Sequence, residues 1–185
     1  MNRLIVGMSG ASGALIGIGL LKALQQFEDW ETHLILSRAA EQTIRMETDY
    51  SIETVRAMAS HVHSIDDIGA CISSGTFKTA GMVIVPCSMK TVAGIATGYS
   101  DNLLLRAADV TLKERRRLVL VARESPLSPI HLRNMLTLAE LGAMILPPVL
   151  SFYNRPATVE EHIHHIIGKI LCAFDLELPG YRRWM

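Results

Sequence analysis

The sequence has few charged and few aromatic side chains for a chain of 185 residues. Charged residues make up 19% and aromatic residues 5%, and the formal net charge is zero, with 18 basic and 18 acidic residues. A balanced charge argues against the basic surface that nucleic-acid binding requires, and it does not indicate an acidic macromolecular partner. Any charge on a ligand must therefore be met by a few locally placed side chains.

Cysteine is scarce as well, and no apolar run approaches the length of a membrane span. The three cysteines, Cys71, Cys87 and Cys172, are odd in number and lack the spacing of a metal site or a redox pair. The chain enters an apolar strand near residue 3 without a charged leader segment. These absences predict a soluble, cytoplasmic protein without disulfides, a bound metal or a membrane partner.

Hydrophobic residues, in contrast, are abundant at 49% of the chain. This share exceeds what the core of one domain of this length should consume. The surplus predicts apolar contact surfaces between subunits, and therefore a homo-oligomer.

Short apolar runs alternate with longer helical patterns along the whole chain, which predicts a single domain over residues 1–185. Strands are expected near 3–8, 32–37, 81–86, 117–122 and 143–146. Continuous apolar strands separated by helices indicate an α/β fold: a three-layer, doubly wound, mostly parallel sheet of the Rossmann or flavodoxin kind. Ligands of such sheets bind beyond the carboxyl ends of the strands. The segments expected to converge there are 9–13, 37–38, 86–91, 123–128 and 147–153.

The first of these segments, Ser9 to Gly13, joins an apolar strand to an apolar helix and predicts a phosphate site. NAD is disfavoured, because Met8 replaces the first glycine of the dinucleotide motif and the second strand ends at Ser37 and Arg38 instead of an acidic residue. FMN is favoured, since nearby hydroxyls suit one phosphate and a ribityl chain. NADP, with Arg38 at its extra phosphate, and a tight turn without a ligand remain alternatives.

The segment Pro86 to Thr91 follows an apolar strand and opens a helix. Ser88 and Thr91 are expected to cap this helix while its free N–H groups face a flavin, although capping alone explains them equally well. Cys87 is expected to pack in the core, because no base lies near it in sequence.

Charged side chains gather in two further places. The segment Asp101 to Lys113 predicts a helix capped by Asp101, with Arg106 and Lys113 on one face and Asp109 in pairing range of either. A solvated, ion-paired face is the ordinary interpretation of that pattern. The pair Arg123 and Glu124 follows a strand and is expected at the crevice, where arginine and lysine side chains would bind a second phosphate.

The last helix begins at Thr158 and contains His162, His164 and His165. Two of them share a face, but no third ligand is evident, so a polar helix surface is preferred to a metal site. Tyr153, Lys169 and Trp184 are isolated candidates for a substrate pocket.

Several stretches together carry a family resemblance, and they extend from about residue 3 to residue 184. They are Met8 to Gly13, Met46 to Asp49, Pro86 to Ser88, Asn102 with Leu103, Arg106 to Val110, Leu112 to Arg116, Val121 with Arg123 and Glu124, Ile130 to Leu132, and Asn134 to Leu136. With them the chain resembles the UbiX-type flavin prenyltransferases, a group formerly described as phenylacrylic acid decarboxylases.

The resemblance implies a metal-independent prenyltransferase that moves a dimethylallyl group from dimethylallyl monophosphate to N5 and C6 of reduced FMN. The prenylated FMN then serves a UbiD-type decarboxylase, in ubiquinone biosynthesis or in aromatic acid decarboxylation. The family also implies a homododecamer with active sites at subunit boundaries.

The resemblance also assigns residues. FMN would be bound by Gly10, Ala11, Ser12, Ser37, Ser88, Met89, Lys90, Thr91 and Arg123. The prenyl phosphate would be bound by Tyr153, Lys169 and Arg106. The catalytic set would be Glu124, Lys113, Glu47 and Trp184. The family commonly has arginine at the position of Lys169, so the charge is kept here but the bidentate fork is lost.

Two other functions fit the same fold. One is an FMN-dependent decarboxylase of cysteine-containing peptides, which would want a catalytic histidine after the second strand, where this chain offers Glu47. The other is a non-catalytic FMN-binding subunit of a decarboxylase.

Overall fold

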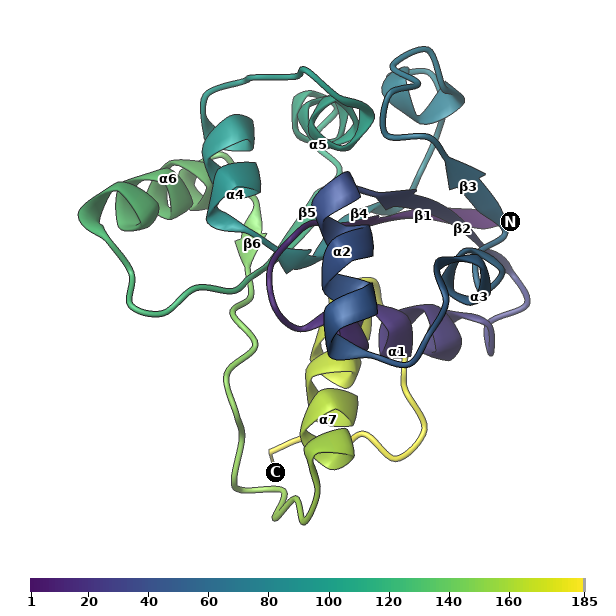
Figure 1. The fold of residues 1–185 in the computed structure, drawn as a ribbon, viewed down its shortest axis with the longest axis vertical. Helices are drawn as coiled ribbons and strands as arrows, with labels where there is room; N and C mark the ends of the chain where they lie inside the picture. The colour runs from purple at the N-terminus through teal and green to yellow at the C-terminus, as the bar shows by residue number, and fades with distance from the viewer. Residues whose placement is uncertain (185) are drawn as a thin grey trace.

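The computed structural model describes residues 1–184 and contains a six-stranded sheet in which all paired strands run parallel. The strands are β1 (Asn2–Met8), β2 (Trp30–Leu36), β3 (His61–His63), β4 (Gly81–Cys87), β5 (Arg117–Ala122) and β6 (Met144–Ile145). Their order across the sheet is β3-β2-β1-β4-β5-β6 (Figure 1). The chain therefore winds in one direction from β1 and in the other from β4, and ligands of such sheets bind at this switch point.

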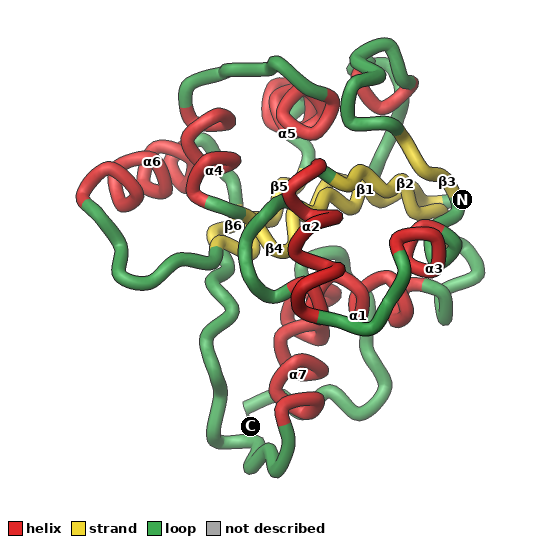
Figure 2. The backbone as a smooth tube through the Cα atoms, viewed as in Figure 1, coloured by secondary structure: helices red, strands yellow, loops and turns green. Residues whose placement is uncertain are grey.

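Helices cover both faces of the sheet. They are α1 (Ala14–Leu24), α2 (Arg38–Glu47), α3 (Ile52–Arg56), α4 (Met89–Ala96), α5 (Leu103–Lys113), α6 (Pro129–Glu140), α7 (Val159–Cys172) and a short 3₁₀ helix, η1 (Cys71–Ser73). One core contains side chains of α1, α2, α3 and α7, and the other contains side chains of η1, α4, α5 and α6 (Figure 2). The predicted three-layer, doubly wound α/β fold is confirmed.

The alternation of side chains along each strand supplies both cores. Leu4 and Val6 of β1 face the α1 side, whereas Ile5 between them faces the α5 side. Every residue of β4 is buried. A parallel strand with helices on both faces needs apolar residues on both faces, which is why these strands are continuous apolar runs in the sequence.

Two local predictions were wrong. Strand β3 was missed because it has only three residues, two of them histidines, and it lies at the edge of the sheet, where no continuous apolar run is needed. The residue that caps α5 is Asn102, whose side chain accepts a hydrogen bond from the amide of Leu105 at 3.1 Å, and not Asp101. The cap Ser88 of α4 is confirmed, whereas Thr91 lies within that helix. The last helix begins as expected, with Thr158 as its cap.

The segment that follows β6 leaves the sheet. Figure 1 shows residues 147–158, here called the C-terminal arm, running away from the strands to α7, and residues 175–184 returning beside that helix. Several large apolar side chains on this segment and on α6 are exposed in the single chain, including Val149, Phe152, Ile130 and Leu136. Such surface is what subunit contacts bury. None of the helices within residues 1–184 has the length and apolar character needed to cross a membrane.

The close contact between Gly81 of β4 and the backbone of β5 allows a test of how these two strands pack. Gly81 has φ of +150° and lies opposite Arg117, and a Cβ atom at Gly81 would lie 2.2 Å from the Arg117 carbonyl oxygen. We expect Gly81→Ala to lower the free energy of unfolding by about 3 kcal/mol. Gly98→Ala is the control, because φ there is +68° but no atom lies within 4 Å of the added Cβ; its expected cost is about 1 kcal/mol. Denaturant unfolding that ranks the two equally would contradict the packing.

Candidate functional site

The loops at the carboxyl edge of the sheet are tied together by hydrogen bonds. The hydroxyl of Ser9, after β1, donates to the carbonyl of Pro86 at 3.0 Å and accepts from the amide of Ser88 at 2.8 Å. The amide of Arg123, after β5, donates to the carbonyl of Cys87 at 3.0 Å. The loops that follow β1, β4 and β5 therefore converge as predicted, and Ser9, which is buried, joins two of them.

The second strand delivers another hydroxyl to this edge. The amide of Ser37 donates to the carbonyl of Met8 at 3.0 Å, and the Ser37 hydroxyl accepts from the amide of Ala40 at the start of α2. At the start of α4, the Ser88 hydroxyl lies 3.1 Å from that of Thr91 and accepts from the Thr91 amide. Helices α2 and α4 thus both begin here, with their N–H groups and partial positive charge at the same edge.

A carboxylate occupies the N-terminus of α1. Glu47, the last residue of α2, accepts hydrogen bonds from the amides of Gly13 at 2.9 Å and Ala14 at 3.0 Å. Partial burial alone would raise the pKa of Glu47, but hydrogen bonds from the Ser12 hydroxyl and these two amides, with the nearby Arg123 guanidinium, lower it below its usual value. Glu47 is therefore a carboxylate at neutral pH, and it lies close to both Ser12 and Arg123.

This contact refines the predicted phosphate site. The sequence predicts a phosphate at the start of α1, whereas in this structure the amides there bind the carboxylate of Glu47, a side chain of the same protein. The remaining donors around the crevice suit an FMN phosphate and ribityl chain: hydroxyl groups, the first N–H groups of α4 and one guanidinium. They come from Ser12, Ser37, Ser88, Thr91 and Arg123.

Other predicted flavin contacts differ in exposure. Gly10 and Ala11 lie in the loop between β1 and α1, and a Cβ at Gly10 would lie 2.4 Å from that of Ala39, so this loop packs directly against α2. Met89 is buried and Lys90 is exposed. Buried Cys87 packs in the core as predicted, and burial raises the pKa of its thiol.

Glu124 follows Arg123 and is exposed at the same edge. One of its carboxylate oxygens accepts a hydrogen bond from the amide of Ser125 at 3.0 Å. The sequence-predicted pair of base and acid thus lies beside the loops that carry Ser9 and Ser88.

A second group lies on the C-terminal arm. Tyr153, Lys169 and Trp184 line one cavity of about 590 Å³, and the Tyr153 and Trp184 rings meet edge to face with 5.2 Å between their centroids. The structure thus brings together three residues that were isolated candidates in the sequence. The residues lining this cavity come from the segment before α7, from α7 itself and from the chain after it, and none comes from the loops that follow β1, β4 or β5. Within one chain, Tyr153 lines cavities to which those loops contribute no residue, and the convergence of segment 147–153 with the loops stays a prediction.

His165 was missed as a site residue. It was expected on a polar helix surface, but it is buried and lies 3.2 Å from the Tyr153 hydroxyl through Nε2. Burial lowers its pKa, with further contributions from neighbouring cationic groups. His162 also differs from the expectation, since it is half-buried with its ring against Phe152. The burial of His165 could have been predicted from its position in the sequence of α7, where it lies among apolar residues such as Ile163 and Ile166.

The basic residues of α5 form a third group. Arg106 forms an ion pair with Asp109 at 2.7 Å, and Lys113 forms one with its neighbour Glu114 at 2.5 Å. Of its two predicted partners, Asp109 therefore pairs only with Arg106. Lys113 precedes β5, whereas Arg123 follows it. A strand of this length separates the two by roughly 20 Å. Lys113 therefore lies at the amino ends of the strands, whereas the loops that carry Arg123 and Glu124 lie at their carboxyl ends.

The fold and the donors at the carboxyl edge are those of an FMN-binding flavoprotein, and comparisons with known proteins agree with this class. A family model described as "Flavoprotein" matches residues 1–171. The chain is 58% identical over 182 residues to a probable UbiX-like flavin prenyltransferase of Streptomyces sp. (strain D7), covering 98% of this chain and 91% of that protein.

Solved structures extend the likeness to the whole fold. The crystal structure of AnUbiX (PadA1) in complex with FMN and dimethylallyl pyrophosphate matches with a TM-score of 0.97 at 52% identity, covering 100% of this chain and 97% of that one. A dodecameric FMN-dependent UbiX-like decarboxylase from Escherichia coli O157:H7 matches with a TM-score of 0.98 at 53% identity, covering 99% of each chain. The chain is a flavoprotein and belongs to the UbiX-like flavin prenyltransferase family.

The Glu47 contact predicts a pH-dependent stability. We expect Glu47→Gln to lower the free energy of unfolding by about 1 kcal/mol at pH 7, because a neutral amide interacts less favourably with the start of α1. The pKa of Glu47 in the folded protein lies below the unfolded value of 4.5. Its stabilising effect is therefore complete above that pH and is lost as the pH falls through the folded pKa.

Unfolding midpoints of Glu47→Gln and the parent should accordingly converge as the pH falls below 4.5 and through the folded pKa of Glu47. Glu28→Gln is the control, since Glu28 is an exposed carboxylate in the turn after α1. A difference that persists unchanged in acid would show that Glu47 acts by packing and not by charge.

Proposed function

We propose that this protein is a flavin prenyltransferase that transfers the dimethylallyl group of dimethylallyl monophosphate to N5 and C6 of reduced FMN. The observation that carries the proposal is the likeness, over the full chain and at 52% identity, to a protein solved with both FMN and a dimethylallyl phosphate ester. The loops at the carboxyl edge offer the donors that FMN requires. A cysteine-peptide decarboxylase or a non-catalytic FMN-binding subunit is the alternative that the assay below separates.

In this reaction reduced FMN supplies the nucleophilic ring atoms, and the carbon–oxygen bond of the donor breaks as phosphate leaves. Fixed cations stabilise the negative charge that collects on the leaving phosphate. We assign this role to Lys113, Arg123 and Lys169, with Arg106 and the Tyr153 hydroxyl binding the same phosphate.

Glu124 is the proposed proton carrier. It is exposed at the edge of the flavin loops, and the second pKa of a phosphate monoester, about 6, allows the leaving group to accept a proton. Glu47 keeps the loop between β1 and α1 in place beside Arg123. Trp184 offers a π face that stabilises an allylic cation without trapping it.

The proposed residues lie in three groups that one chain does not bring together. One group surrounds Ser12 and Arg123, one includes Lys113 at the opposite edge of the sheet, and one includes Tyr153 on the C-terminal arm. A shared site therefore requires neighbouring copies of the chain. The exposed apolar side chains of α6 and the arm provide contact surface, and a dodecamer like that of the E. coli O157:H7 relative is the proposed assembly.

We further propose that residues 1–185 act as one FMN-binding domain and that the reaction takes place in the cytoplasm. Cys71 is free and exposed, a state that a reducing compartment preserves. The prenylated flavin is proposed to pass to a UbiD-type decarboxylase as its cofactor.

The first test is a turnover assay. Protein, reduced FMN and dimethylallyl monophosphate are incubated without air, and the flavin is analysed by mass spectrometry. We expect a gain of one dimethylallyl group, and a loss of at least about 100-fold in rate for Glu124→Ala with FMN binding retained. Dimethylallyl pyrophosphate in place of the monophosphate identifies the preferred donor. Unchanged flavin together with carbon dioxide released from a cysteine-terminated peptide would replace the proposal with the decarboxylase.

The second test addresses the shared site. Lys113→Ala and Glu124→Ala chains are co-expressed and the mixed oligomers are purified. If each site takes Lys113 from one copy and Glu124 from another, about a quarter of the sites in a random mixture regain both residues. Arg123→Ala mixed with Glu124→Ala is the matched control, because these neighbours come from one chain and no site regains both. An inactive Lys113→Ala and Glu124→Ala mixture would contradict the shared site.

A further inference from the structure

A cluster of imidazole side chains lies away from the flavin loops, at the β3 edge of the sheet. In the parallel register of β2 and β3, His33 lies opposite His61 and Ile35 lies opposite His63. Alternate residues of a strand point to the same face, so His33, His61 and His63 share one face. Stacking of the His33 ring on those of His61 and His63, at centroid distances of 4.7 Å and 5.2 Å, agrees with this placement.

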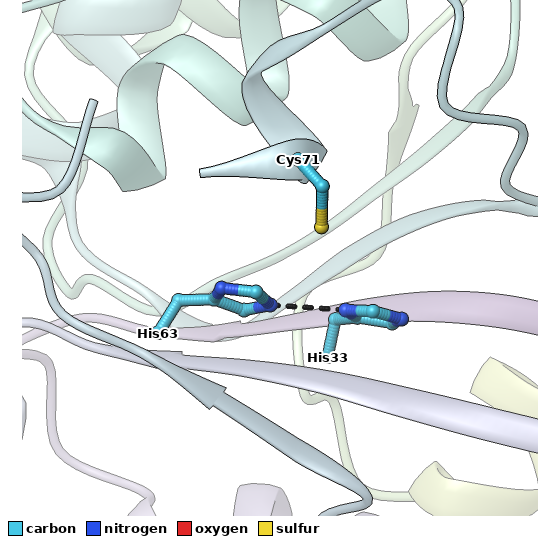
Figure 3. Close-up of side chains that lie close together, drawn as sticks. All are labelled: His33, His63 and Cys71. Atoms are coloured by element: carbon cyan, nitrogen blue, oxygen red, sulfur yellow. Dashed lines mark hydrogen bonds between the residues drawn. The ribbon is translucent and has the colours of Figure 1, made fainter. Parts of the chain in front are cut away.

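The sulfur of Cys71 completes the cluster. Figure 3 shows the Cys71 side chain, carried by η1, pointing down toward the gap between the His33 and His63 rings. Nδ1 of His33 lies 2.9 Å from Nε2 of His63, and the ligand atoms of all three residues lie within 4.8 Å of one another. Three residues separated by up to 38 positions in the sequence thus direct donor atoms to one point.

The His33 ring is poorly satisfied by the protein alone. The residue is only 3% exposed; its Nδ1 faces His63, and its Nε2, on the far side of the ring from His63 and Cys71 (Figure 3), is buried without a hydrogen-bond partner. An unpartnered buried ring nitrogen is costly.

We propose that His33, His63 and Cys71 form a binding site for a zinc-like transition-metal ion. Imidazole nitrogen and thiolate sulfur are the ligands that Zn²⁺ prefers, whereas Mg²⁺ and Ca²⁺ require oxygen. Ligand atoms around a tetrahedral Zn²⁺ lie about 3.4 Å apart. Binding an ion would therefore require the half-buried His63 and the exposed Cys71 to rotate from their present positions.

The surroundings supply the outer contacts of such a site. A carboxylate oxygen of Glu31 lies within 4.8 Å of ring nitrogens of His33 and His61, and Glu31 pairs with Arg3 at 3.0 Å. A carboxylate that accepts a hydrogen bond from a metal-binding ring orients that ring and raises its basicity, and Glu31 is near enough to take this place if it moves toward His33. Three protein ligands leave a fourth position for water or for His61. A bound ion would fasten the edge strand β3 and the segment after it to β2.

Metal titration of the FMN-loaded, tag-free protein tests the site. After chelator treatment under reducing conditions, Co²⁺ is added while absorption is followed at the red end of the spectrum, where tetrahedral Co²⁺ absorbs and oxidised flavin does not. We expect saturation at one ion per chain and loss of the signal on adding Zn²⁺. Cys71→Ser and His63→Gln should each weaken binding at least about tenfold, whereas Cys172→Ser and His164→Gln should leave it unchanged. Equal binding by Cys71→Ser and Cys172→Ser would overturn the proposal.

A second measurement needs no variant. Zn²⁺ should protect Cys71 from alkylation, as read by peptide mass spectrometry, while the partly exposed Cys172 reacts equally with and without the ion. Equal alkylation of Cys71 in both conditions would overturn the site. Neither readout depends on prenyl transfer, so the result is separate from the fate of the proposed function.

Discussion

The common direction of the six strands is the constraint on which the site depends. Because all paired strands are parallel, β1, β2, β4 and β5 end at one edge, and the loops after them meet there through Ser9 and Arg123. The helices that follow β1, β2 and β4 begin at the same edge, so their N–H groups point to one crevice. An anion-binding edge thus follows from topology before any individual side chain is considered.

The same constraint explains why one chain does not hold the whole proposed site. Helix α5 returns antiparallel to the strands, so Lys113 at its end must lie at the amino edge, opposite Arg123. The arm that carries Tyr153 leaves the sheet after β6 and packs on α7. In the proposed assembly, neighbouring copies of the chain would bring these groups together, and the exposed apolar side chains offer surface for those contacts.

Much of the fold was predictable from the sequence. A parallel strand with helices on both faces is a continuous apolar run, and such runs, like that of β4, can be seen in the order of the residues alone. The edge strand β3 was not, since a strand with one neighbour needs no such run. The loops around Ser12, Ser88 and Arg123 were also predictable, because each follows a strand. Spacing along the chain could not reveal that His165 turns inward to Tyr153, or that Cys71 meets His33 and His63, because these contacts arise only when separate elements pack.

Glu47 connects the stability of the loop with the binding of the flavin. Its carboxylate already takes the two amides at the start of α1, and a phosphate at the same amides would face a like charge at close range. The flavin phosphate is therefore expected to use the hydroxyls of Ser37 and Ser88 and the first turn of α4, leaving Glu47 beside Arg123. In that arrangement Arg123 lies between two anions, and its charge both lowers the pKa of Glu47 and attracts the second phosphate. The carboxylate of Glu47 thus orders the loop, and in that arrangement it would also direct where each phosphate binds.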